Sequence, residues 1–311
     1  MKKVPIIDLR AVDEPGQIAA LDAACRDHGF FLVSGHGADD AIGRMWQQAS
    51  DFFSRPRSEL RKIERTAEKP LGYFDRELTK RKRDLKQVFD FTRPLTDESG
   101  YNQWPEEMAA FRQGMSDYHE AMGTVAVQVM ALLHRALGID AEPMCGDPDT
   151  STARLNYYPV DDPLSGEEQA INTELGDMAL HHHTDPGLVT LLVQDDTGGL
   201  QTLSTDHGWI DVPPREGTII VNLGDSVQAW SNDIYKAAVH RVLPMTERAR
   251  MSTPYFYHPA RDAIIEPHPQ LALGQPHYRP FSWREFIQNR VDDNYADQGK
   301  EDTQVSKYRI A

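Results

Sequence analysis

The sequence predicts an α+β protein with a mainly β core, in which N-terminal helices buttress a double-stranded β-helix, or jelly roll. Before about residue 150, apolar residues recur every three or four positions, which is the spacing of a buried helix face. After that point, short β-branched and aromatic runs alternate with Gly, Pro and Asp turn residues. No internal repeat or low-complexity linker separates the two parts. We therefore expect one compact unit made of a helix-rich region, 1–149, and a jelly-roll core with a closing helix, 150–311.

The helix-rich region is expected to contain two strands and three helices. Residues 1–9 read as an opening β-strand, and the buried run 30–33 predicts another. Apolar residues at helical spacing predict helices over about 17–28, 39–53 and 106–137. Gly29 follows the first helix as its C-terminal stop. The Met and aromatic stripes of these helices indicate core packing rather than a cofactor site.

The jelly-roll core is predicted from four β-rich runs. These cover 153–158, 188–194, 218–223 and 251–257, and turn residues separate them. A closing helix over about 283–291 is expected to pack back on the body and to leave a polar tail behind it.

The composition argues against several kinds of partner. The chain has 311 residues, and no apolar run approaches the roughly 18 residues of a membrane span. Its formal charge of −15 would repel nucleic-acid phosphates and anionic lipid. The basic segment 80–83 is interpreted as a solvated surface segment. Only two cysteines occur, Cys25 and Cys145, so no disulfide framework or cysteine-based zinc site is expected and a cytoplasmic setting fits best.

A candidate metal site begins with His183 and Asp185, just before the predicted strand 188–194. In extended backbone, residues two apart point to one face, so these two side chains can grip one ion together. His181 and His182 are taken as neighbours of the site, because only His183 has an aspartate two residues on. With 12 histidines, about one His-x-Asp is expected by chance. The pair therefore needs a further ligand.

His240 is the candidate for that ligand. It lies beside Val239 and Val242 at an expected strand rim, and alone it would be taken as a structural histidine. The ordered set of His-x-Asp, a distant histidine and then Arg250 and Ser252 changes this interpretation. Two neutral imidazoles and one carboxylate on one face of an octahedral ion leave three adjacent positions open, which suits Fe(II) that binds a chelating co-substrate and O2 together. A catalytic zinc ion needs one open position, and the His-Glu-x-x-His motif of zinc hydrolases is absent.

Arg250 and Ser252 are predicted to share one face of a strand. A guanidinium fork can hold a carboxylate through paired charge-assisted hydrogen bonds, and a hydroxyl beside it adds another donor. This pair suits the distal carboxylate of a dicarboxylic 2-oxo acid, whose oxo-acid end then reaches the iron. The alternative is that Arg250 is a surface salt-bridge residue, and the ordered set disfavours it.

Short segments in a fixed order extend this pattern over nearly the whole chain. They are Val4-Pro5-Ile6-Ile7-Asp8-Leu9, Gly29-Phe30-Phe31, Ser34-Gly35-His36-Gly37, Asn156-Tyr157-Tyr158-Pro159, His183-Thr184-Asp185-Pro186-Gly187, Gly199-Leu200-Gln201, Asn222-Leu223-Gly224-Asp225, His240-Arg241-Val242 and Arg250-Met251-Ser252. In these segments and their order, the chain resembles a bacterial-type member of the isopenicillin N synthase-like branch of the Fe(II)/2-oxoglutarate-dependent oxygenases.

The resemblance implies a dioxygenase jelly-roll core over 150–311, packed against an N-terminal dioxygenase region over 1–149. It implies that the iron ligands are His183, Asp185 and His240. It implies that the far carboxylate of 2-oxoglutarate is held by Arg250 and Ser252, and that the co-substrate pocket is also lined by Asn156 and Tyr158. His36 belongs to the N-terminal strand-turn of the family and is expected to be structural.

The implied activity is oxidation, by hydroxylation or desaturation, of an unactivated C–H bond of a small-molecule metabolite. Fe(II), 2-oxoglutarate and O2 take part, and succinate and CO2 are released. Family halogenases vacate the carboxylate position, so Asp185 argues against halogenation. Two departures, Pro159-Val160-Asp161-Asp162-Pro163 in place of Pro-Pro-Cys and Lys236-Ala237 in place of Lys-Ser, touch no expected ligand.

Several alternatives stay open at this point. A same-fold Fe(II) oxidase that dispenses with 2-oxoglutarate, of the ring-closing or ascorbate type, also keeps the Arg-x-Ser pair, and succinate production separates the two. A non-catalytic binder on this scaffold would be expected to lack a metal ligand. Aromatic residues from segments that the family uses as lids and walls are candidates for the substrate pocket: Tyr73, Phe89, Phe91, Tyr101 and Phe256. The sequence does not decide the substrate, the choice among hydroxylation, desaturation and ring closure, or the oligomeric state.

Overall fold

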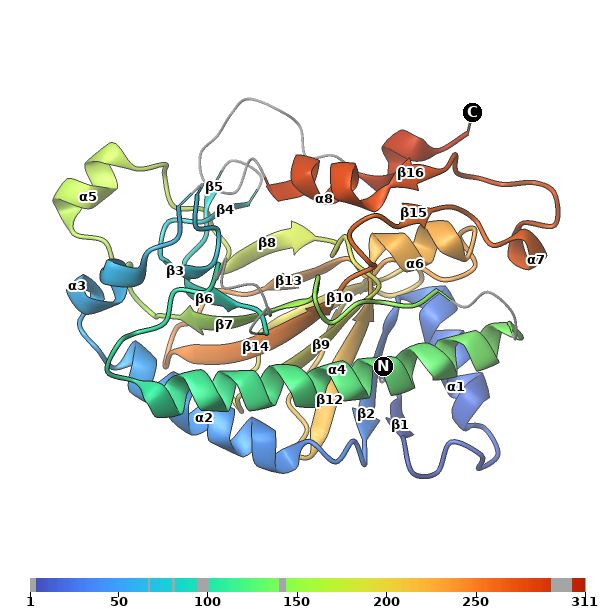
Figure 1. Cartoon of the computed structure of the whole chain (residues 1–311), viewed down its shortest axis with the longest axis horizontal. Helices are drawn as coiled ribbons and strands as arrows, with labels where there is room; N and C mark the ends of the chain where they lie inside the picture. Colours follow the sequence, from blue (N-terminus) through green and yellow to red (C-terminus); the bar gives the residue numbers. More distant parts are fainter. Residues whose placement is uncertain are drawn as a thin grey trace.

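A large β-sheet forms the centre of the molecule (Figure 1). The computed structural model describes residues 4–66, 68–79, 82–93, 101–139, 144–291 and 304–310. In order across the sheet, the strands are β1 (Ile6–Asp8), β2 (Phe30–Ser34), β12 (Thr218–Leu223), β9 (Val189–Gln194), β14 (Arg250–Tyr257), β7 (Thr152–Tyr158), β6 (Gln87–Phe91) and β3 (Gly72–Phe74). β1 and β2 are parallel, and the other neighbours are antiparallel. Strands from both sides of residue 149 therefore share one sheet.

A smaller sheet accompanies the large one. It consists of β11 (Gly208–Asp211), β10 (Leu200–Ser204), β13 (His240–Val242) and β8 (Leu180–His183), all antiparallel. The two sheets form the double-stranded β-helix core, so the predicted α+β fold with a mainly β core is confirmed.

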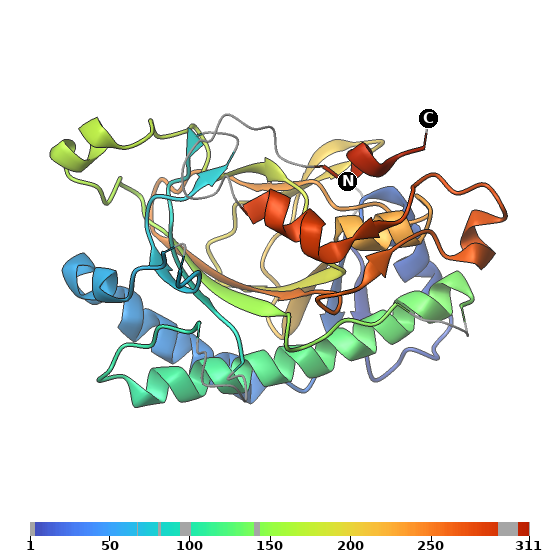
Figure 2. The ribbon, with the colours of Figure 1, turned by 45° about the horizontal axis from the view of Figure 1, so that its top comes forward.

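Three helices cover one face of the large sheet, and the 29-residue α4 runs along its whole width (Figures 1 and 2). They are α1 (Gln17–Asp27), α2 (Asp39–Phe53) and α4 (Ala109–Leu137). Met115 and Met122 of α4 belong to the same buried cluster as Leu191 and Tyr255 of the sheet. Tyr118 of α4 also donates a hydrogen bond to a backbone carbonyl of β14 at 2.6 Å. The helices therefore fix the large sheet from behind.

The period-two alternation of the strands decides what faces the helices. On β14, Tyr255 and Tyr257 join the helix-side core, whereas Arg250, Ser252 and Phe256 line a cavity on the opposite face. The neighbouring strands β7 and β9 alternate in the same way. One face of the sheet is thus structural, and the other is available for chemistry.

The remaining elements are short. They are α3 (Arg57–Leu60), the 3-10 helix η1 (Arg61–Ile63), the hairpin β4 (Leu78–Thr79) and β5 (Lys82–Arg83), α5 (Gly166–Ile171), α6 (Asp225–Trp230), the pair β15 (Ile264–Ile265) and β16 (Phe281–Ser282), α7 (Pro269–Ala272), α8 (Trp283–Val291) and the 3-10 helix η2 (Val305–Tyr308). Within the described residues, no helix is both long enough and apolar enough to span a membrane.

The predicted elements are found within a few residues of their expected bounds. The helix expected from residue 106 begins at Ala109, and the strand expected from 188 begins at Val189. Gly29 ends the first helix with φ +66, and a Cβ there would clash with the Lys236 carbonyl oxygen, so only glycine fits. Several short strands were not specified from the sequence as strands with bounds: β3, β4, β5, β6, β8, β10, β11, β15 and β16.

Two expectations for the surface need correction. Residues 80 and 81 lie outside the described residues, and Lys82 is exposed, but Arg83 is buried because Asp162 provides its counter-charge. The prediction of a solvated segment is therefore wrong for Arg83. The tail is not wholly polar surface either. Tyr308 stacks on Phe281 with 4.2 Å between ring centroids, and Val305 is buried in the same cluster.

Candidate active site

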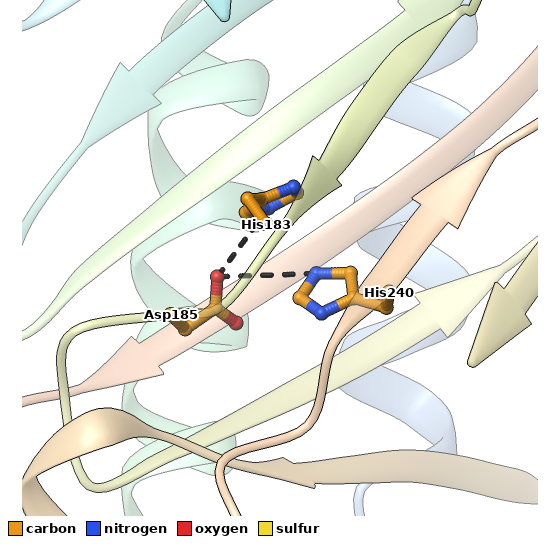
Figure 3. Close-up of side chains that lie close together, drawn as sticks. All are labelled: His183, Asp185 and His240. Atoms are coloured by element: carbon orange, nitrogen blue, oxygen red, sulfur yellow. Dashed lines mark ion pairs between the residues drawn. The ribbon is translucent and has the colours of Figure 1, made fainter. Parts of the chain in front are cut away.

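Three side chains from the small sheet converge on one point (Figure 3). His183 ends β8, Asp185 lies in the turn that follows, and His240 begins β13, where it pairs with His183 across the strands. Asp185 Oδ1 lies 3.6 Å from His183 Nε2 and 3.9 Å from His240 Nε2. Across the described ranges, these three form the one group of His, Cys, Asp and Glu residues that could hold a metal ion.

The two imidazoles are oriented as metal ligands. His183 Nδ1 hydrogen-bonds to the His181 backbone carbonyl at 2.8 Å, and His240 Nδ1 hydrogen-bonds to the Ala238 carbonyl at 3.0 Å. Because a carbonyl only accepts, each Nδ1 carries a proton, which leaves Nε2 as the nitrogen that can bind a metal. Burial, and then the nearby His240, lower the pKa of His183 to about 3, so its imidazole stays neutral at physiological pH.

The carboxylate of Asp185 is held so that one oxygen is left for a metal. Thr190 Oγ1 and Asn222 Nδ2 donate to its Oδ2 at 2.5 and 2.9 Å, while Oδ1 faces the two imidazoles. Burial alone would raise the pKa of Asp185, but the two histidines and these hydrogen bonds lower it to about 2. Two neutral nitrogens and one ionised oxygen fit Fe(II) with positions left open.

Thr190 and Asn222 had not been assigned a role from the sequence. Both occupy the cavity-facing positions of β9 and β12, and Asn222 lies within one of the recognised segments. Strand alternation carried this information, but their contact with Asp185 depends on the pairing of β9 with β12, Thr190 opposite Asn222.

A buried guanidinium lies in the same cavity as the three candidate ligands. Arg250 is fully buried, and it donates to Ser252 Oγ at 3.0 Å and to Gln194 Oε1 at 2.9 Å. Its Nε has no hydrogen-bond partner within the described structure. No described carboxylate forms a direct ion pair with it, and Asp195 acts on its charge only from a greater distance. Burial lowers the pKa of Arg250, because a charged guanidinium is costly away from water. Such a cation has spare donors and no directly paired carboxylate, so it can bind an incoming carboxylate.

Asn156 and Tyr158 stand beside this arginine. In the pairing of β7 with β14, Tyr158 lies opposite Arg250 and Asn156 lies opposite Ser252. The guanidinium carbon is 5.0 Å from the centre of the Tyr158 ring. The four residues predicted for the co-substrate therefore lie together on one sheet face.

One cavity of about 570 Å³ joins the metal cluster to the arginine. His183, Asp185, His240, Arg250, Ser252, Asn156 and Tyr158 all line it. This size is within the usual range for a small-molecule site and leaves room for two small ligands side by side.

Four of the five aromatic pocket candidates lie outside this cavity, and Phe256 lines it. Tyr73, Phe89 and Phe91 are buried in the helix-side core instead, because Phe89 pairs with Leu155 on β7 and so shares its helix-facing side. Tyr101 is 44% exposed. The prediction therefore put Tyr73, Phe89 and Phe91 on the wrong face of the sheet. It also put Tyr101 in the cavity, although Tyr101 does not line it.

Two other histidines named from the sequence are not part of the metal cluster. His181 is engaged with Asp84 and Asp177, and His36 is buried and accepts a hydrogen bond from the Ala38 backbone N–H at 3.1 Å. Neither belongs to the metal-binding group. The sequence reasoning also missed four charged residues that line the cavity: Glu77, Lys86, Arg154 and Arg290.

Comparison with known proteins decides the family. Residues 150–259 match the 2OG-Fe(II) oxygenase superfamily, and residues 4–107 match the non-haem dioxygenase in morphine synthesis N-terminal family. Gibberellin 20 oxidase 2 of Oryza sativa subsp. indica is 32% identical over 302 residues, which cover 91% of this chain and 74% of that protein. The chain belongs to the 2OG-Fe(II) oxygenase superfamily. This oxygenase is therefore an oxidoreductase, a 2-oxoglutarate-dependent dioxygenase that uses Fe(II) and O2.

Solved structures agree with the oxygenase in fold. A full-length Neurospora crassa protein in complex with alpha-KG and 5-formyluracil superposes with a TM-score of 0.78 at 28% identity, covering 93% of this chain and 95% of that one. JOX2 in complex with 2OG, Fe and JA superposes with a TM-score of 0.79 at 26% identity, covering 100% and 90%.

Proposed function

We propose that this oxygenase hydroxylates or desaturates an unactivated C–H bond of a small-molecule metabolite, with 2-oxoglutarate held between the metal and Arg250. The observation that carries the proposal is the buried guanidinium of Arg250, which has spare donors and no direct ion pair, in the same cavity as the His183, Asp185 and His240 cluster. A cavity with a metal site and a separate carboxylate site suits a dicarboxylic 2-oxo acid.

Each residue has a defined task in this proposal. His183, Asp185 and His240 hold Fe(II), and Arg250 and Ser252 bind the far carboxylate of 2-oxoglutarate. Asn156 and Tyr158 line the pocket between these groups. When bound, the iron with 2-oxoglutarate and O2 supplies C–H oxidation coupled to release of succinate and CO2.

The protein itself orients the reactants and excludes water. The hydrogen bonds from Thr190 and Asn222 hold Asp185 ionised and directed at the metal position. The sheet behind the site is sealed by the helix-side core, so bulk water is excluded from that side. Apolar residues such as Phe256 and Pro254 line the cavity beyond the co-substrate position and can place a C–H bond near the metal.

The substrate class, family branch and location are also proposals. Relatives are named for small molecules, gibberellin in one case, and the Neurospora crassa protein has been solved with thymine and with 5-formyluracil. The charge of −15 disfavours nucleic acid and anionic membranes as partners. We assign the chain to the isopenicillin N synthase-like branch as a bacterial-type member. The free thiols of Cys25 and Cys145 are compatible with a reducing cytoplasm.

An anaerobic titration tests the proposal directly. Purified metal-free protein is titrated with Fe(II) and then with 2-oxoglutarate, and the weak visible charge-transfer band of an oxo acid chelated to iron is followed. The band is expected in the wild type and in His182→Ala, whose histidine is adjacent to the cluster but not part of it, and it is expected to be lost in His183→Ala.

The outcomes separate the alternatives. Fe(II) binding without a band, and O2 uptake without succinate, would favour the same-fold oxidase that dispenses with 2-oxoglutarate. Absence of Fe(II) binding, or equal loss in both histidine variants, would contradict the metal assignment.

A further inference from the structure

A second polar region of the cavity wall lies away from Arg250. Glu77, Lys86 and Arg154 all line the cavity. Along β7, Arg154 precedes Tyr158 by four residues, or roughly 13 Å of extended strand. Tyr158 pairs with Arg250, so Arg154 lies in the part of the cavity beyond the proposed 2-oxoglutarate position.

The three residues belong to a buried charge cluster that is compensated internally. Arg154 donates to Asp90 at 2.6 and 3.0 Å and to Glu77 at 2.8 Å. Lys86 Nζ lies 2.7 Å from Glu77 and 3.1 Å from Asp84. Arg65 also bridges Glu77 and Asp90, so the cluster contains three cations and three carboxylates. Each of its three cations forms direct ion pairs, which distinguishes it from Arg250.

The hydrogen-bonding capacity left over in this cluster is on the donor side. Arg154 has five N–H bonds and Lys86 has three, and the contacts above use three and two of them. Glu77 already accepts from Arg65, Lys86 and Arg154. Burial alone would lower the pKa of Lys86, but Asp84 and Glu77 raise it, so the ammonium stays charged. The cavity therefore meets N–H donors rather than a carboxylate that lacks a partner.

Apolar residues adjoin these donors. Phe256, Pro254 and Leu78 line the cavity together with Arg154, and Phe256 lies on the strand beside β7. A molecule that fits this region has an apolar body and presents an oxygen to the two cations. A cationic group would meet two cations there, and the Glu77 carboxylate that lines the same region is already bound to Arg65, Lys86 and Arg154.

We propose that Arg154 and Lys86 form a substrate subsite that receives a carbonyl or carboxylate oxygen of an otherwise apolar small molecule. The assignment rests on the proposed function, because it treats the cavity beyond the 2-oxoglutarate position as the substrate site. It also excludes a positively charged group at this end of the substrate.

The structure offers a matched pair of variants. Arg65 and Arg154 both donate hydrogen bonds to Glu77 and Asp90, but of the two only Arg154 lines the cavity. Arg154→Met and Arg65→Met each remove one cation from the cluster, and they differ in whether a cavity donor is lost. Lys86→Met removes the second cavity donor. If Arg154→Met does not fold, Arg154→Lys is used in its place.

The probes are fragments built on a few shared ring skeletons, each as carboxylate, primary amide and primary amine. Binding is measured by anaerobic calorimetry on the protein loaded with Fe(II) and 2-oxoglutarate. Carboxylates and amides are expected to bind, and amines are not. Arg154→Met and Lys86→Met are expected to weaken the oxygen-bearing fragments about tenfold or more, as loss of a charged donor does, with Arg65→Met within about twofold of wild type. A preference for carboxylate over amide identifies an anionic group, and equal binding identifies a carbonyl.

The subsite is refuted if amines bind as well as the matched carboxylates and amides, or if no oxygen-bearing fragment binds. Equal weakening by Arg65→Met and Arg154→Met refutes it as well, since the effect would then come from the cluster as a whole. The charge-transfer titration is run on the same preparations. If the wild type shows no charge-transfer band, the proposed function is contradicted. If the band forms but the fragments do not bind, only the subsite is contradicted.

Discussion

Replacement of Arg250 by methionine separates a ligand-binding role from a structural one. Arg250 has five N–H bonds, of which contacts to Ser252 and Gln194 use two, and its Nε is unpartnered within the described structure. Two charge-assisted hydrogen bonds to a carboxylate, at about 1.5 to 3 kcal/mol each, give about 3 to 6 kcal/mol. Arg250→Met is therefore expected to raise the Kd for 2-oxoglutarate at least about a hundredfold.

The same substitution is expected to leave the ligand-free protein as stable as the wild type. A buried charge without a counter-charge is costly, and its replacement by an apolar side chain of similar length is often neutral or stabilising. Thermal unfolding measures both effects. At about 100 times its Kd, 2-oxoglutarate should add about 2.7 kcal/mol of stability to the wild type loaded with Fe(II) and little to the variant. Ser252→Ala is the milder companion variant, with a loss of about 1 kcal/mol in binding.

Two results would refute this reasoning. A large fall in the melting temperature of ligand-free Arg250→Met would mean that the guanidinium serves the fold. An unchanged Kd for 2-oxoglutarate, with Fe(II) still bound, would mean that the carboxylate is held elsewhere.

Three further predictions follow from other contacts. Asn222→Ala removes a hydrogen bond to the candidate ligand Asp185, so Fe(II) affinity measured by chelator competition should fall about 10- to 100-fold, and an unchanged affinity would contradict this role. Burial lowers the pKa of His119 from 6.5 to about 4, so the unfolded chain binds the proton more tightly and stability is lost as the pH falls from about 6.5 towards 4. Urea unfolding measures the free energy of unfolding at pH 7 and at pH 5. Between these two pH values it should fall by about 2 kcal/mol less in His119→Gln than in the wild type. The buried carboxylate of Asp75 pairs with Arg57 and two other arginines, so Asp75→Asn should lower the free energy of unfolding by about 2 kcal/mol, and an effect near zero would show that the arginines find other partners.

Local pattern in the sequence was sufficient for β7 and β14, which carry the co-substrate residues, but not for β8, which carries His183. The β-branched runs predicted β7, β9, β12 and β14, and the two-residue rule placed Arg250 with Ser252 on one face. Pattern was not sufficient for β6, where the choice between the two faces depends on the register with β7. A single step in that register moves Phe89 from the cavity to the helix-side core.

Charge pairing between distant segments was also out of reach. Arg83 is buried because the chain brings Asp162 to it, and Lys86 and Arg154 share Glu77 although 68 residues separate the two cations. Residue type alone assigns such side chains to the surface. Only the folded arrangement supplies the partners that allow them to be buried.

The alternation along β14 has a consequence for how this enzyme can diversify. Pro254 and Phe256 face the cavity, whereas the intervening Tyr255 belongs to the core beneath the helices. Substitutions at neighbouring positions should therefore act on different properties: those at 254 and 256 on which molecule is accepted, and those at 255 on whether the chain folds. A library that randomises 254 and 256 and keeps 253 and 255 fixed can explore new substrate preferences on an unchanged scaffold.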